Sequence, residues 1–209
     1  MVGGSLARTA ERTRGARRAE MVRVAARLFS ERGYHGTSMQ HLGDALGLLR
    51  GSLYAHIGSK EELLFEVADE GADRFLARGE EAVASDLPAA ERLRLLLVGH
   101  VETAANHLDA ATVFLNEWRY LSADLRAVIQ EKRDRYEAMV AEIVSDGTAD
   151  GEFRADADPR LAVLLVLSAA NWTYEWYRPG GRLTPAEVGE RFAALIVDGL
   201  RAQTKGDAS

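Results

Sequence analysis

Short polar and basic side chains gather between residues 37 and 60, where they could bind phosphates and read the edges of bases. The positions that could make such contacts are Thr37, Ser38, Arg50, Gly51, Ser52, Tyr54, His56 and Lys60. The guanidinium of Arg50 can donate to both major-groove acceptors of a guanine, an interaction worth about 1–3 kcal/mol of discrimination. The side chains of Thr37, Tyr54, His56 and Lys60 suit phosphate oxygens. These residues predict binding to duplex DNA.

Two short helices joined by a tight turn must position these side chains. Ser38 can cap the first helix, Gly47 permits the turn, and the second helix follows from about Arg50 to His56. A small apolar core would fix the angle between the helices, and its residues are Leu42, Leu46 and Leu53. In a helix-turn-helix the N-terminal end of the second helix enters the major groove. Arg50, Gly51 and Ser52 are therefore the expected base-reading positions.

The charge of the chain is divided unevenly along its 209 residues. The net charge is −6, which by itself argues against a nucleic-acid partner. Residues 1–60, however, hold nine Arg and one Lys against three Glu and one Asp, a net charge of +6. The remainder holds 16 basic and 28 acidic residues, a net charge of −12. A basic head on an acidic body is expected when only one end contacts phosphates, although a solvated basic helix without a partner would look the same.

Several kinds of site are excluded or disfavoured by what the sequence lacks. The absence of cysteine excludes disulfides and thiolate metal sites. No apolar run approaches the roughly 20 residues that span a bilayer, and the N-terminus lacks the apolar core of a secretory signal, so a cytoplasmic location is expected. No catalytic triad, phosphate loop or metal-binding helix motif is found, and we expect neither enzymatic activity nor a cofactor. His100 and His107, with Glu117 as a conceivable third ligand, are too sparse a set to favour a metal site.

The apolar periodicity predicts an all-α protein of about nine helices. The expected helices cover residues 14–32 (ended by Gly33), a short helix after Ser38, 50–56, a long helix from 60, 88–106, 110–120, 122–145, 160–177 and 185–202. Starts are marked by capping patterns at Ser59–Glu62, Asp158–Pro159 and Thr184–Glu187. Residues 1 to about 12 are expected to lack regular structure. The expected domains are a DNA-binding helix-turn-helix domain, 1–60, and an effector-binding and dimerisation domain, 61–209.

The first 65 residues resemble the DNA-binding domain of TetR-family repressors. The resemblance is carried by Gly36-Thr37-Ser38, Leu42, Ala45, Gly47, Gly51-Ser52-Leu53-Tyr54, His56 and Ser59-Lys60-Glu61-Glu62-Leu63-Leu64. It implies an all-α homodimer of about nine helices, with Tyr54 and Lys60 at typical phosphate-contacting positions. Two residues depart from the family pattern, because Ile57 replaces an aromatic residue and Leu49 a small polar one. Both are expected to be tolerated in a hydrophobic core.

The resemblance also implies that the last two helices pair with their copies in a four-helix interface. The residues support this expectation, since 160–177 are apolar nearly all round in their first half and 185–202 carry a wide apolar stripe. A two-fold dimer would place its recognition helices about 34–36 Å apart on a palindromic operator. The alternative is that this surface packs only within the monomer.

The body resembles, less specifically, the branch of the family that represses fatty-acid, steroid and other acyl-CoA degradation genes. This likeness rests on Asn116-Glu117-Trp118 and on the run from Trp176 to Thr184. It implies an acyl-CoA thioester or a similar effector, and the candidate lining residues are Phe114, Trp118, Tyr120, Asn171, Trp172, Glu175 and Trp176. Trp172 and Trp176 lie four residues apart and could instead be core or dimer contacts. A coenzyme A tail wants basic partners, and only Arg119, Arg178 and Arg182 are plausible, so a smaller uncharged effector remains open.

The leading hypothesis is therefore a dimeric repressor that a small hydrophobic effector releases from its operator. The effector would act through the long helix that begins at Lys60, with a coupling free energy of about 1–3 kcal/mol. One alternative is a repressor that senses an uncharged drug or metabolite, as in efflux control. A helical enzyme with an incidental basic head and an architectural DNA-binding protein without an effector are further alternatives.

Overall fold

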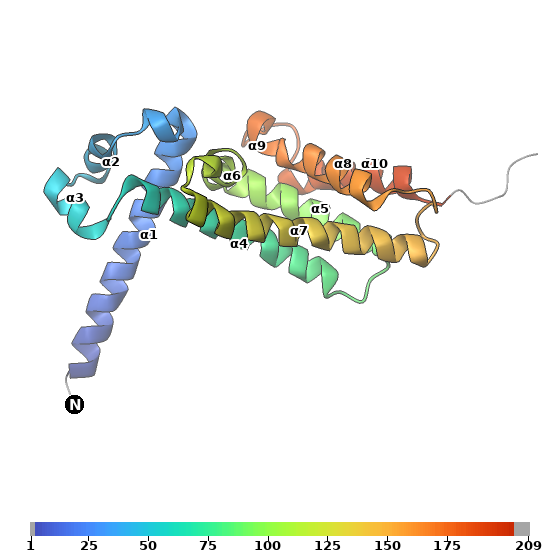
Figure 1. Ribbon diagram of the computed structural model, residues 1–209, viewed down its shortest axis with the longest axis horizontal. Coiled ribbons are helices and arrows are strands. Elements are labelled where there is room, and N and C mark those ends of the chain that lie inside the picture. Colours follow the sequence, from blue (N-terminus) through green and yellow to red (C-terminus); the bar gives the residue numbers. More distant parts are fainter. Residues whose placement is uncertain (1–2, 203–209) are drawn as a thin grey trace, which may run out of the picture. The chain divides into compact units, whose positions relative to one another are not determined.

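The computed structural model describes the backbone of residues 3–202 and the side chains of residues 15–49, 51–54 and 57–202. Over that range the chain forms α-helices and one 3-10 helix and no β-strand (Figure 1). The helices are α1 (Gly3–Gly36), α2 (Met39–Leu46), α3 (Arg50–His56), α4 (Lys60–Val83), α5 (Ala89–Asn106), α6 (Leu108–Leu115), η1 (Glu117–Tyr120), α7 (Ala123–Ala149), α8 (Pro159–Asn171), α9 (Thr173–Trp176) and α10 (Pro185–Leu200). The predicted all-α class is confirmed. Trp172 alone separates α8 from α9, which were expected as one helix.

The first helix is longer than the sequence pattern suggested. It begins at Gly3, so the expectation of irregular structure up to residue 12 is wrong for residues 3–12. Residues 6–12 consist mainly of Leu, Ala, Arg and Glu, which favour helix, and they contain no proline. At the other end Gly33 leaves the helical region with φ 72° and ψ 160°, as its predicted role as a helix terminator requires.

Local capping chemistry fixes α2 and the turn that follows it. The Ser38 hydroxyl accepts a hydrogen bond from the His41 amide (3.1 Å), and the Ser38 amide donates to Nδ1 of His41 (3.2 Å). Gly47 ends the helix in the left-handed conformation, φ 65° and ψ 29°, where a side chain would be strained. The next amide, of Leu48, donates to the Gly43 carbonyl (2.9 Å). The predicted helix-turn-helix geometry is therefore present.

The chain divides into two compact units, and each is described by itself below. Unit 1 comprises the described residues up to Gly71 together with Asp109–Ile129. Unit 2 comprises Ala72–Leu108 and the described residues from Gln130 onward. Helices α4 and α7 pass from one unit to the other. Packing and function need not share a boundary, so the functional division at residue 60 stays a prediction.

The core of unit 1 joins α1, α2, α3 and α4. Its fully buried large side chains are Met21, Phe29, Leu42, Leu53, Ile57, Leu63 and Leu64. Leu42 and Leu53 are thus buried as predicted, whereas Leu46 is only half-buried. On the rim of this core Arg18 of α1 bridges Glu62 (2.6 Å) and Glu66 of α4. The core and this bridge together hold the helix-turn-helix against α1 and α4.

Helix α5 forms the centre of unit 2 and packs along α10, with α8 and α9 beside it (Figure 1). Gly189 permits the approach of α10, because a Cβ atom there would lie 2.7 Å from the backbone of Val98. The ends of α8 and α10 follow the predicted caps. Asp158 accepts from the amides of Arg160 and Leu161, while Thr184 and Glu187 form a reciprocal capping box before Pro185. None of the helices in the described part of the chain is long and apolar enough to cross a membrane.

Candidate nucleic-acid interface and effector region

The N-terminal end of α3 presents small, exposed groups. Gly51 and Ser52 are exposed in its first turn, and Tyr54 is 45% exposed two residues after Ser52. Ser38, at the start of α2, is also exposed. The Arg50 and His56 side chains lie outside the described residues, although the helix that carries them runs over the predicted range. Four of the eight predicted DNA contacts therefore have side chains or backbone that a duplex could reach.

Thr37 and Lys60 are placed differently from the sequence expectation. The Thr37 side chain is 1% exposed, and its hydroxyl lies 3.0 Å from both the Leu28 and Gly33 carbonyl oxygens. The Lys60 ammonium donates to the carbonyls of Tyr34 and Thr37 (both 2.8 Å) and lies 4.1 Å from the centre of the Tyr34 ring. Burial lowers the pKa of Lys60. In this geometry both residues hold the connection between α1 and α2, and the buried Thr37 hydroxyl is not available to a phosphate.

A buried carboxylate completes this connection from the other segment of unit 1. Glu117 of η1 is buried, and its Oε2 accepts a hydrogen bond from the Tyr34 amide (2.5 Å), which follows the break at Gly33. Tyr120, at the end of η1, stacks on the Tyr34 ring with centroids 6.2 Å apart. At a helix break an amide N–H loses its partner within the helix, and the hydrogen bond to the carboxylate replaces that partner. The sequence indicates Glu117 only as a conceivable metal ligand and as part of the family resemblance, and does not reveal this contact.

Leu49 contradicts the expectation that it belongs to a hydrophobic core. Its side chain is 84% exposed, whereas Ile57, the other departure from the family pattern, is fully buried as expected. Leu49 occupies the N-cap position of α3 with an extended backbone, φ −64° and ψ 145°, and makes no side-chain capping hydrogen bond. An apolar residue at an N-cap costs about 1 kcal/mol relative to Ser, Thr, Asp or Asn. The α2–α3 turn directs this side chain outward, which the sequence pattern could not show.

The predicted effector-lining residues are divided between the two units. Phe114 is buried and Trp118 half-buried in unit 1, where Tyr120 is exposed on the surface. In unit 2 Asn171 is half-buried, Glu175 is exposed, and Trp172 and Trp176 remain largely exposed. The Trp176 ring packs edge-on against Phe192 of α10. That these residues line one pocket therefore stays a prediction.

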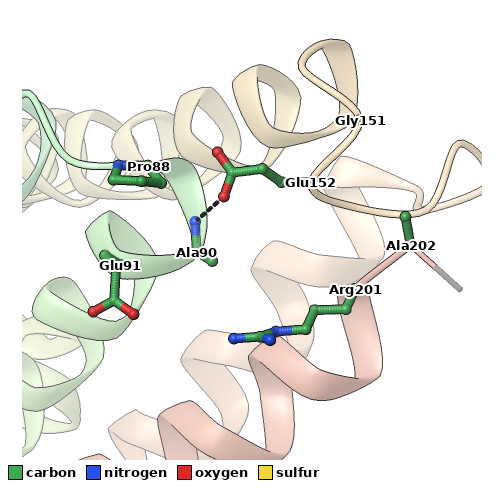
Figure 2. A pocket seen from close by; sticks show the side chains of 7 residues that line it. All are labelled: Pro88, Ala90, Glu91, Gly151, Glu152, Arg201 and Ala202. Atoms are coloured by element: carbon green, nitrogen blue, oxygen red, sulfur yellow. Dashed lines mark hydrogen bonds between the residues drawn. The ribbon is translucent and has the colours of Figure 1, made fainter. Parts of the chain in front are cut away.

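Two surface cavities are lined by other residues. One, of about 460 Å³, lies in unit 2 and is lined by Pro88, Ala90, Glu91, Gly151, Glu152, Arg201 and Ala202 (Figure 2). Its central carboxylate, Glu152, accepts from the amides of Ala89 (2.9 Å) and Ala90 (3.1 Å) and so caps α5. The other, of about 520 Å³, lies in unit 1 between α1 and the α2–α3 turn. The Glu152 carboxylate of the first cavity is therefore already engaged in capping α5.

His100 and Tyr136 form a buried polar pair in unit 2. A hydrogen bond of 3.0 Å joins Nδ1 of His100 to the Tyr136 hydroxyl, and Phe75 packs against the imidazole. His100 is 1% exposed, and its Nε2 has no hydrogen-bond partner. Burial, reinforced by the charge of Arg133, lowers the pKa of His100 to about 3, and burial raises the pKa of Tyr136. Both groups are therefore neutral near pH 7. The described residues contain no group of three His, Asp or Glu that could hold a metal ion.

Part of the exposed surface of α8 and α10 is apolar. Leu161 (63% exposed), Leu164 and Leu165 lie three and four residues apart on one side of α8, opposite its buried alanines and valines. On α10 the side chain of Leu195 is 76% exposed. A helix with leucines on the side that faces away from its own core presents apolar surface to a partner. Part of the surface predicted to form a dimer is thus uncovered in a single chain.

Comparison with known proteins places these features in one family. Residues 86–200 match the family described as "Tetracyclin repressor-like, C-terminal domain", and residues 22–67 match "Bacterial regulatory proteins, tetR family". The chain belongs to the TetR family. It is 31% identical over 185 residues to the HTH-type transcriptional repressor KstR2 of Mycobacterium tuberculosis, and the match covers 88% of this chain and 92% of that protein.

Solved structures of TetR-family proteins show the same fold. The ketosteroid transcriptional regulator KstR2 of M. tuberculosis superposes with a TM-score of 0.85, 31% identity and coverage of 90% of this chain and 96% of that one. The regulator PfmR of Thermus thermophilus gives a TM-score of 0.80 at 36% identity, covering 87% and 99%. AibR in complex with isovaleryl coenzyme A and operator DNA gives 0.76 at 30%, covering 88% and 97%. The relatives' names describe DNA-binding regulators of transcription.

The sequence does not reveal the structural roles of three residues, Leu49, Glu117 and His100. Glu117 is buried and Leu49 is exposed, and local periodicity reveals neither. The sequence does not predict that His100 pairs with Tyr136, because the two residues are 36 positions apart. The i, i+3 and i, i+4 spacing of α7 and α5 could have suggested that both residues face the core, but not that they meet.

Proposed function

We propose that this TetR-family protein is a sequence-specific repressor that binds a palindromic operator as a homodimer. The exposed first turn of α3, held by a fixed turn at Gly47 and a buried core, is the observation that carries this proposal. Base reading falls to the start of α3, with Gly51 and Ser52 in the groove and Tyr54 and Ser38 toward the phosphates. Thr37 and Lys60 act as positioning residues, because their polar groups bind the chain itself.

Dimerisation through α8 and α10 supplies the two-fold symmetry. Four leucines of these helices are more than half exposed in the single chain, and a second copy would cover them. An isologous pair presents two recognition helices to one face of the duplex and doubles the phosphate contacts. The operator is accordingly an inverted repeat with half-sites about one helical turn apart.

The effector proposal rests on the relatives and on the body of the molecule. AibR is described with isovaleryl coenzyme A and operator DNA, and KstR2 as a ketosteroid regulator. An acyl-CoA thioester is therefore the effector class that we favour, with release of the operator on binding. Contacts from Phe114, Trp118, Asn171, Trp172, Glu175 and Trp176 belong to this proposal.

An uncharged effector is the second candidate, and two observations favour it. Two of the three arginines considered for a coenzyme A tail already have partners: Arg178 donates to the Glu175 and Tyr177 carbonyls (3.0 and 2.8 Å), and Arg119 lies 3.3 Å from Oδ1 of Asn116. The buried His100–Tyr136 pair is neutral, and Nε2 of His100 would suit a neutral hydroxyl or carbonyl group.

Selection from a pool of random duplexes, followed by a binding titration, tests the proposal. An inverted repeat should emerge, and one dimer should bind each repeat. Isovaleryl-CoA and longer acyl-CoAs should then weaken the complex, with coenzyme A alone and the free acids as controls. Recovery of no preferred sequence would reject the repressor. Release only by compounds without the coenzyme A moiety would reject the thioester and support the uncharged effector.

A further inference from the structure

Leu49 is the most exposed of the large apolar side chains in the described part of the chain, and it stands next to the proposed base-reading residues. No other leucine among the described residues of unit 1 is strongly exposed. Single exposed apolar residues are common on protein surfaces and by themselves mean little. The position of Leu49 gives it more weight, because it is the N-cap of the recognition helix α3.

The residue type at this position opposes local stability. The N-caps of α2, α8 and α10 are Ser38, Asp158 and Thr184, each of which accepts an amide hydrogen bond. The N-cap of α3 is a leucine that accepts none, and Pro88 before α5 and Trp172 before α9 likewise make no side-chain capping bond. At Leu49 the chain therefore both lacks a capping side chain and exposes an apolar one. Departures of this kind from local rules tend to occur where function requires them.

The backbone holds Leu49 in place from both sides. The amide of the preceding Leu48 donates to the Gly43 carbonyl (2.9 Å), and the Leu49 carbonyl accepts from the amide of the buried Leu53 (3.0 Å). The exposed residues Gly51 and Ser52 follow closely. A side chain on a backbone so fixed can make a contact without first ordering that backbone.

The C5 methyl of thymine is the one methyl group that the bases present on their major-groove edges, and it is the usual partner of an apolar side chain there. We propose that Leu49 packs against a thymine methyl in each half of the operator and thereby determines specificity at that base pair. This inference rests on the proposed function, since it requires that α3 enter the major groove. It adds a hydrophobic contact to the hydrogen bonds expected from the other residues of the same turn.

Replacement of thymine by deoxyuridine tests the contact, because it removes the methyl group and leaves base pairing unchanged. Once selection has defined the operator, each thymine is replaced in turn in both half-sites. The wild-type protein should lose affinity about fourfold per half-site at one position, the size expected for burial of one methyl group. L49A should bind thymine and deoxyuridine operators equally at that position. Leu87→Ala, at an exposed leucine of unit 2, should keep the wild-type difference.

The outcomes separate this inference from the function on which it rests. If wild-type protein selects an operator but no thymine is sensitive to deoxyuridine, or L49A keeps the sensitivity, the methyl contact is wrong and the repressor stands. If no operator is selected, both fail. Light scattering checks a different occupant, a second copy of the chain: a lower mass of L49A than of wild type would assign Leu49 to a protein interface and overturn the contact with DNA.

Discussion

The exposed faces of the two units differ in a way that points to two different partners. The start of α3 in unit 1 exposes a glycine, a serine and a tyrosine, with one leucine among them. The surface of α8 and α10 in unit 2 exposes leucines in a row. A hydrated polyanion is matched by small polar groups that remain in water when unbound, whereas a row of leucines is stabilised by a second apolar surface. The difference supports the proposal that DNA binds the first face and that a copy of the chain binds the second.

The α1–α2 connection of unit 1 and the interior of unit 2 differ in how their buried polar groups are matched. The buried polar groups at the α1–α2 connection of unit 1 are matched, since Thr37 and Glu117 each have a backbone partner. In unit 2 the buried atoms Nε2 of His100 and Oγ1 of Thr173 have none. Unmatched buried polar atoms cost stability, and a ligand that matched them would recover part of that cost. The two atoms of unit 2 thus keep a hydrogen-bonding capacity that the α1–α2 connection of unit 1 has already used.

The largest effect is expected from a charge on the apolar face of unit 2. Leu195→Asp places a carboxylate on the proposed two-fold interface and should convert the dimer to a monomer in light scattering. Operator affinity should fall about 100-fold or more, because a single head keeps only half the phosphate contacts. Leu87→Asp, also at an exposed leucine of unit 2, should change neither. A monomeric wild-type protein would remove the basis for assigning a second copy to this face.

The buried pair of unit 2 should make stability depend on pH. The pKa of His100 in the folded chain, about 3, lies below its ordinary value of 6.5, so the unfolded chain takes up the proton first. Its contribution is therefore complete above about pH 7 and is lost as the pH falls from 6.5 toward 3. Between pH 7 and pH 5 the loss should be about 2 kcal/mol. Chemical denaturation should show this loss in wild type and in His107→Gln but not in His100→Gln; equal slopes in all three would contradict burial of a neutral His100.

The matched α1–α2 connection of unit 1 predicts a smaller effect that also separates two roles of Lys60. Lys60→Met should lower the free energy of unfolding by about 1–2 kcal/mol, because the carbonyls of Tyr34 and Thr37 lose a charged donor. Operator affinity should fall, but the slope of log affinity against log salt should stay unchanged. A decrease of about one in that slope would instead show that Lys60 neutralises a phosphate. Thr37→Val is the matched variant and should leave the slope unaltered for the same reason.

The smallest effect on stability is expected from a substitution at Leu49, the N-cap of α3. Leu49→Ser restores a capping side chain to α3 and should stabilise the folded chain by about 1 kcal/mol. Thermal denaturation should record this gain while operator discrimination falls. A loss of stability would mean that Leu49 serves packing rather than recognition and would remove the contrast between this face and the leucines of α8.

Much of the fold could be predicted because its local signals involve residues three or four apart. The caps at Ser38, Asp158 and Thr184 and the left-handed Gly47 are all found where the sequence placed them. Such contacts close within one helical turn, so the nearby sequence suffices to specify them. The break at Trp172 and the longer α1 escaped this reasoning, because the break is marked by neither proline nor glycine and the glycines at the start of α1 do not prevent helix there.

The sequence by itself determined most of the helices, the turn at Gly47 between α2 and α3, and the family, since each rests on residue types at short spacing. Only the tertiary structure decided that Thr37 and Lys60 face the chain, that Glu117 meets Tyr34, that His100 meets Tyr136, and that Leu49 faces solvent. Three of these contacts join residues more than 20 positions apart, and the exposure of Leu49 depends on the path of the whole turn. Burial is a property of everything packed around a residue, and no local pattern contains that information.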